Sequence, residues 1–189
     1  MPAPLLPKKE VVSRLLRVFR DSGYEGATIA RMSEATGLVK ASLYHYFPKG
    51  KEQMAEAVFT AACEWLGEHV IAPLQSDQPP AKRVNEMVKN LDRFYKGGMD
   101  TCIIDVLVQG DMRVIFHPKL KPALEAWVAA MAKVALDSGV KPDDASRRAE
   151  DALVRIEGAI IVSRALDRTA PFKRAMAEIG HSLLGQDRS

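Results

Sequence analysis

The sequence of 189 residues lacks most of the features that mark secreted, metal-binding and membrane proteins. Its two cysteines, Cys63 and Cys102, show no C-x-x-C or His–Cys spacing, so we expect buried thiols and no metal, haem or disulfide framework. No apolar run approaches the roughly 20 residues that span a bilayer. Three prolines within residues 1–7 interrupt the apolar stretch that a signal peptide needs. These absences predict a cytoplasmic protein without cofactors.

Sequence signals for enzymes and for β-sheets are missing as well. There is no nucleophile elbow, P-loop or dinucleotide fingerprint, and the four histidines are scattered, so we predict that the chain is not an enzyme. No segment alternates with a period of two, and no Asn-Gly or Asp-Gly hairpin turn occurs. With 47% hydrophobic and 27% charged residues, the composition is that of a globular protein. The prediction is an all-α fold.

Positive charge is concentrated near the start of the chain. Residues 1–51 contain nine Lys or Arg and four acidic residues, a balance of +5, whereas the whole chain carries +3, which leaves −2 for residues 52–189. A basic first quarter on a slightly acidic body indicates a polyanionic partner at the N-terminal end, although a solvated basic face would give the same balance.

Hydrophobic spacing predicts three helices in this basic quarter: residues 8–22, ended by Gly23, then 28–35, capped by Thr28, and, after Gly37, 39–46. This order, with its glycine turn, is typical of a helix-turn-helix, whose last helix enters the major groove of DNA. We expect the second and third helices to be anchored by apolar side chains: Ile29, Met32, Ala35, Leu38, Leu43 and Phe47. A surface helix in an ordinary three-helix bundle is the alternative.

The remaining sequence predicts further helices separated by prolines and glycines. They span residues 51–71, 81–96, 101–115, from about 118 to 139, 142–166 and 171–184, with a loop at 75–80. We therefore predict two domains: a three-helix bundle with a helix-turn-helix at residues 1–50, and a larger helical domain for ligand binding and dimerisation at 51–189.

Two stretches, Gly23–Ile29 and Ala35–Glu52, strongly resemble the DNA-binding domain of the TetR family of transcriptional regulators; the second contains KASLYHYFPKGKE. The PxGKE motif and Cys102 after Gly97-Gly98 are similar to the LmrA/YxaF-like branch. The resemblance implies a homodimer on a palindromic double-stranded operator, and a repressor that a small-molecule effector releases from DNA. Regulation by thiol oxidation, or by no effector, are the alternatives.

By position, the resemblance implies that Thr28 caps the second helix and contacts phosphate, while Lys40, Ala41 and Ser42 begin the base-reading helix. Arg31 replaces a capping-box glutamate, which favours phosphate contact. Val39 offers no side-chain cap. The extra Gly50 leaves open which of two lysines meets phosphate. The complete predicted DNA-binding set is Thr28, Arg31, Lys40, Ala41, Ser42, Tyr44, His45, Tyr46, Lys49 and Lys51.

The second domain offers weaker signals. A carboxylate within an apolar helix needs a partner, which makes Asp105 and Glu157 candidates for effector contact. The full candidate set, for which core packing is the alternative, is Phe94, Cys102, Asp105, Phe116, Trp127, Met131 and Glu157. Small and apolar residues in the last two helices predict a four-helix dimer interface, with burial inside a monomer as the alternative.

Overall fold

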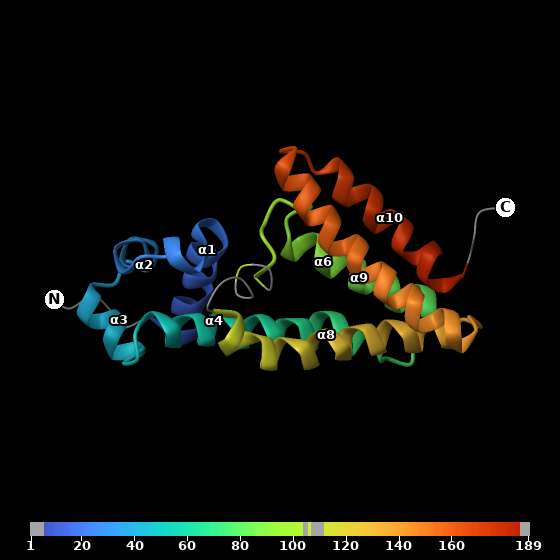
Figure 1. Cartoon of the computed structure of the whole chain (residues 1–189), viewed down its shortest axis with the longest axis horizontal. Helices are drawn as coiled ribbons and strands as arrows, with labels where there is room; N and C mark the ends of the chain where they lie inside the picture. Colours follow the sequence, from blue (N-terminus) through green and yellow to red (C-terminus); the bar gives the residue numbers. More distant parts are fainter. Residues whose placement is uncertain (1–5, 104–105, 107–111, 186–189) are drawn as a thin grey trace. The chain divides into compact units, whose positions relative to one another are not determined.

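The structure is a computed structural model that describes residues 6–103, 106 and 112–185. Within these residues the chain forms helices and no strand, which confirms the predicted all-α fold (Figure 1). It divides into two compact units: a first unit of Met1–Cys63 and Ile103–Phe116, and a second unit of Glu64–Cys102 and His117–Ser189. One division between the units thus follows Cys63, and the two predicted domains, residues 1–50 and 51–189, stay a prediction.

The first unit contains α1 (Lys8–Gly26), α2 (Ile29–Thr36), α3 (Lys40–Tyr46) and most of α4 (Lys51–Leu66). Gly23 has a left-handed φ of 66°, as its predicted stop role requires, but one more helical turn follows it before α1 ends. Gly37 has a φ of 72° and its N–H bonds to the Ser33 carbonyl, so it forms the predicted turn between α2 and α3.

Four of the six predicted anchors are buried, including Leu38, and Ile29 is half-buried. The prediction for Ala35 is wrong, because this residue is exposed near the end of α2. Met32, Leu43 and Phe47 are fully buried. The same unit buries apolar side chains of α1 and α4, which are Val11, Leu15, Phe19, Met54 and Val58. Because the interior of a bundle this small excludes water only when each helix contributes an apolar face, α3 is held by one side and presents the other to solvent.

The second unit contains the end of α4, a π-helical turn η1 (Gly67–Ile71), α5 (Ala72–Leu74), α6 (Pro80–Phe94), most of α8 (Met112–Asp137), α9 (Pro142–Ala165) and α10 (Ala170–Leu184). α10 packs on α9 and on α6. The buried core includes Trp127, Met87, Leu91, Ile156 and Phe172. None of the described helices is long and apolar enough to cross a membrane.

The prediction of a helix break near Pro118 is wrong, because α8 continues through both Pro118 and Pro122. Each proline lacks an N–H and leaves the carbonyl four residues earlier without its helical partner. The affected carbonyls belong to Val114 and Pro118, and both residues are exposed, so water can satisfy them. Exposure at these positions, which the sequence does not reveal, allows the helix to continue.

A candidate DNA-binding surface

The short helix α3 has one buried and one exposed side. Leu43 is fully buried, whereas Lys40, Ala41, Tyr44 and His45 are exposed. At about 100° per residue, Ala41 and His45 lie on the side of the helix opposite Leu43. This side combines a cation, a small residue, a phenol and an imidazole, which suit contacts with phosphates and base edges.

Tyr44 lies between its own helix and the turn that follows it. The Nζ of Lys40 is 5.9 Å from the centroid of the Tyr44 ring. Gly50 has a φ of 70°, and a Cβ placed there would be 3.4 Å from Cε1 of Tyr44. The glycine thus supplies the turn before α4 and packs against this ring, which holds Tyr44 at the edge of the exposed side.

At the start of α2, Thr28 and Arg31 form hydrogen bonds with neighbouring groups of the protein. The Thr28 Oγ1 accepts a hydrogen bond from the Arg31 backbone N–H at 3.3 Å, which confirms the predicted cap. The Arg31 guanidinium donates to the Ser22 Oγ at 2.7 Å and to the Gly26 carbonyl at 3.4 Å. Both residues are exposed, and their roles toward phosphate stay predictions.

The two lysines before α4 have different surroundings. Lys51 Nζ donates to the Glu25 carbonyl at 3.2 Å and lies 4.3 Å from the centroid of the Tyr24 ring. Burial raises the pKa of Tyr24, and the negative charges of Glu52 and Glu25 add to this rise. Lys49 is exposed, and its backbone N–H donates to the Gln53 Oε1 at 2.9 Å. Lys51 therefore braces the start of α4 against the end of α1, while Lys49 faces solvent.

Two predicted contact residues are less accessible than the others. Ser42 is half-buried. Tyr46 is half-buried as well, and its hydroxyl donates a 2.5 Å hydrogen bond to the Leu6 carbonyl. The edge of the His45 ring faces the Tyr46 ring, with centroids 6.2 Å apart. Tyr46 thus connects α3 to the start of the chain.

Val39 is a surface feature that the sequence analysis treated only as a missing cap. The structure confirms that no side chain caps α3 there. The Val39 side chain is 66% exposed at the N-terminal end of the helix. An exposed apolar group beside Lys40 can contact the methyl group of thymine, which is an element of base readout in the major groove. A valine immediately before a short polar helix is the signal that could have identified it.

In the second unit, two candidate effector residues lie together. The Cys102 Sγ donates to the Glu157 Oε1 at 3.4 Å and lies 3.5 Å from the Tyr95 hydroxyl, which donates to it. Cys102 and Tyr95 are buried, and Glu157 is half-buried. We call these three residues the thiol cluster.

The other candidate effector residues are spread more widely. Trp127 and Met131 are fully buried on α8, and Trp127 Nε1 has no hydrogen-bond partner among the residues that the structure describes. Phe94 stacks on Trp65 with ring centroids 3.7 Å apart. Phe116 belongs to the first unit, where it packs on Phe59. Asp105, the remaining candidate, lies outside the described residues.

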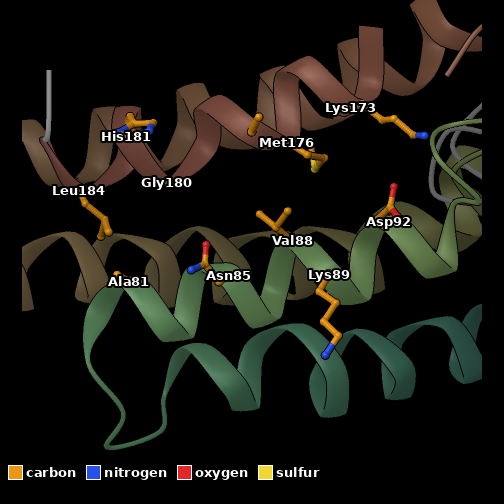
Figure 2. A pocket seen from close by; sticks show the side chains of 11 residues that line it. Ala81, Asn85, Val88, Lys89, Asp92, Lys173, Met176, Gly180, His181 and Leu184 are labelled. Atoms are coloured by element: carbon orange, nitrogen blue, oxygen red, sulfur yellow. The ribbon is translucent and has the colours of Figure 1, made fainter. Parts of the chain in front are cut away.

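A groove of about 600 Å³ runs between α6 and α10 in the second unit (Figure 2). Val88 from one helix and Met176 and Leu184 from the other point into it, and Lys173 and Asp92 lie at one end. The small residues Ala81, Ala177 and Gly180 also line it. The groove could not be predicted from the sequence, because residues of this kind are equally typical of close helix packing.

α9 carries an apolar stripe that the described part of the second unit leaves exposed. Val154 is 72% exposed and Ile161 is 54% exposed, and Val162 and Leu166, the residue directly after α9, are exposed as well. At helical spacing, Val154, Gly158 and Ile161 lie opposite the buried Ile156. We call Val154, Ile161, Val162 and Leu166 the α9 stripe. Exposed apolar patches of this kind mark interaction surfaces.

The first unit has the arrangement of a helix-turn-helix protein: a capped α2, a left-handed glycine turn and a short α3 with an exposed polar side. Sequence comparison gives the same class. The profile for bacterial regulatory proteins of the tetR family matches residues 12–58, and that for the C-terminal domain of LmrA/YxaF-like transcriptional regulators matches residues 80–178. The chain belongs to the TetR family, in its LmrA/YxaF-like branch, and is a DNA-binding transcriptional regulator.

Similarity to known regulators covers most of the chain in some relatives and only part of it in others. The chain is 23% identical over 171 residues to the transcriptional regulator LmrA of Bacillus subtilis (strain 168), covering 87% of this chain and 89% of the relative. It is 33% identical over 63 residues to the transcriptional repressor KstR2 of Mycolicibacterium smegmatis, covering 33% of this chain and 30% of that one. The fold is similar to that of the regulator CifR, solved as a cysteine mutant with a 26 bp operator, with a TM-score of 0.73, 18% identity and coverage of 97% and 98%.

Proposed function

We propose that this chain is a repressor that binds a palindromic operator as a homodimer and leaves it when a small molecule binds the second unit. The observation that carries the DNA-binding part is the exposed side of α3, which is polar and cationic while its opposite side is anchored by Leu43. Repression, rather than activation, is supported by the relative KstR2, which is described as a transcriptional repressor. Regulation follows if the effector binds more tightly to a dimer whose two α3 helices do not fit adjacent turns of the duplex.

In this proposal the residues of the DNA surface have distinct roles. Ala41 and His45 face the base edges, and Val39 contacts a thymine methyl group. Lys40 and Tyr44 contact the edges of the groove or its phosphates. Selection of bound duplexes from a random pool supplies the operator, and the affinity is then measured by fluorescence anisotropy over a range of salt. Tyr44→Ala should weaken binding without unfolding the protein, because its ring is partly exposed.

We infer that Lys49, rather than Lys51, meets phosphate with its side chain. The Lys51 side chain is only 24% exposed and its Nζ donates to the Glu25 carbonyl, whereas Lys49 is exposed. The plot of log K against log salt falls with a negative slope. Lys49→Met should make this slope shallower by about 1, since one phosphate contact is lost. Lys51→Met should leave this slope unchanged and reduce the thermal stability of the first unit. The opposite assignment of the two effects would refute the inference.

The α9 stripe supports the homodimer. Its apolar side chains face away from the monomer's core, and a second copy of the same stripe would cover them through a two-fold symmetric contact. Ile161→Glu should convert a dimer into monomers in sedimentation velocity and weaken operator binding, because each half-site is then bound separately. Val114→Glu is the matched control, since Val114 is 81% exposed but lies on α8. An unchanged dimer in the Ile161→Glu variant would contradict this assignment.

We place the effector contacts at the thiol cluster and the unpartnered Trp127 Nε1. A buried N–H without an acceptor is unfavourable by about 1–3 kcal/mol, and a ligand carbonyl or hydroxyl would satisfy it. The test is a screen for small molecules that release the operator. Glu157→Gln and Trp127→Phe should each weaken the response to an active molecule while operator binding stays unchanged. Val88→Trp, which fills the α6–α10 groove, serves as the comparison: loss of response only in that variant would move the effector site to the groove.

A further inference from the structure

The start of the chain is fastened to the recognition helix α3 by a hydrogen bond that spans forty residues of sequence. Tyr46 Oη donates to the Leu6 carbonyl at 2.5 Å, and the bond is partly buried. Next to it, Lys8 Nζ lies 5.4 Å from the centroid of the Phe47 ring. Pro7 stands between these contacts as the cap residue of α1, and its carbonyl accepts the N–H groups of the first helical turn.

These contacts conflict with a direct role of Tyr46 at phosphate. A phenol has one proton to donate, and phosphate oxygens only accept. While the Tyr46 proton is given to the Leu6 carbonyl, the hydroxyl cannot also donate to DNA. The position of Tyr46 on α3 agrees with this argument. Tyr46 is half-buried, whereas Ala41 and His45, on the side of the helix opposite Leu43, are exposed.

We propose that Tyr46 is a positioning residue, which fixes Leu6 and Lys8 beside the end of α3 so that the Lys8 ammonium meets a phosphate next to the groove. Lys8 is exposed and belongs to the basic first quarter of the chain. Its side chain follows the segment that Tyr46 holds, because only Pro7 separates it from Leu6. The inference rests on the proposed DNA-binding function and adds Lys8 and Tyr46 to it in separate roles.

The test is a double-mutant cycle with Tyr46→Phe and Lys8→Met, measured by anisotropy on the selected operator. Lys8→Met should weaken binding and make the negative slope of log K against log salt shallower by about 1. Tyr46→Phe should weaken binding about three- to tenfold, which corresponds to one ordinary hydrogen bond. In the Lys8→Met background, Tyr46→Phe should have little further effect, since it acts through Lys8. Lys9→Met is the control. Any loss of operator affinity that it causes should add to the loss caused by Tyr46→Phe.

Additive losses from Tyr46→Phe and Lys8→Met would overturn the inference, because they would place the Tyr46 hydroxyl on DNA itself. Wild-type affinity in the Tyr46→Phe variant would overturn it as well. Hydrogen exchange of the free protein provides a readout without DNA. In Tyr46→Phe the amides at the start of α1 should exchange faster while those of α2 stay unchanged. Unchanged exchange in Tyr46→Phe would refute the role of the Tyr46–Leu6 hydrogen bond. If exchange is faster in the variant but the wild-type protein binds no operator, the DNA-binding proposal is refuted instead.

Discussion

The close approach of Gly98 to Phe172 makes one substitution in the second unit especially informative. Gly98 has a φ of +86°, and a Cβ added there would lie 2.5 Å from the Cβ and 2.7 Å from the Cγ of Phe172. Phe172 is fully buried, and these atoms are at the base of its side chain, so it cannot rotate away. Gly139 has a φ of +94° but no atom within 4 Å of its virtual Cβ. The pair separates backbone strain from steric overlap.

An alanine with a left-handed φ costs about 1–2 kcal/mol, and overpacking of a filled core costs about 1–3 kcal/mol. Gly98→Ala should therefore lower the free energy of unfolding by about 2–5 kcal/mol, and Gly139→Ala by about 1–2 kcal/mol. Urea unfolding followed by tryptophan fluorescence measures both, because Trp65 and Trp127 lie in the same unit as the two glycines. Equal losses in the two variants would refute the steric argument.

Three further predictions concern the second unit. A hydrogen bond from Arg83, and a further one from Lys133, lower the pKa of Asp137 from its ordinary value. Asp137→Asn should therefore destabilise the protein at neutral pH, and its difference from wild type in urea unfolding should fade as the pH falls below about 4. Cys102 is 2% exposed, so in a Cys63→Ser variant a thiol reagent should label it only after unfolding; rapid native labelling would favour redox sensing. Gly180 has open space around it, so Gly180→Ala should raise the free energy of unfolding by up to about 1 kcal/mol, and the melting temperature with it.

Local sequence was sufficient for the helix-turn-helix. The cap at Thr28, the left-handed Gly37 and the apolar anchors of α3 each depend on residues within a few positions of one another, so composition and spacing define them. The exposed side of α3 follows from the same spacing, because burying Leu43 leaves Ala41 and His45 on the other side. The family resemblance is carried by this segment for the same reason.

Contacts between distant parts of the chain required the tertiary structure. Nothing near Tyr46 in the sequence indicates that its hydroxyl meets the Leu6 carbonyl, and nothing near Lys51 indicates the Glu25 carbonyl. The partner of a long polar side chain depends on which backbone carbonyl the fold brings within about 3 Å, and that is decided by packing of the whole bundle. The sequence alone thus determined where the helix that we propose to face DNA lies and which side it exposes. Packing decided which of its polar groups are already engaged by the protein.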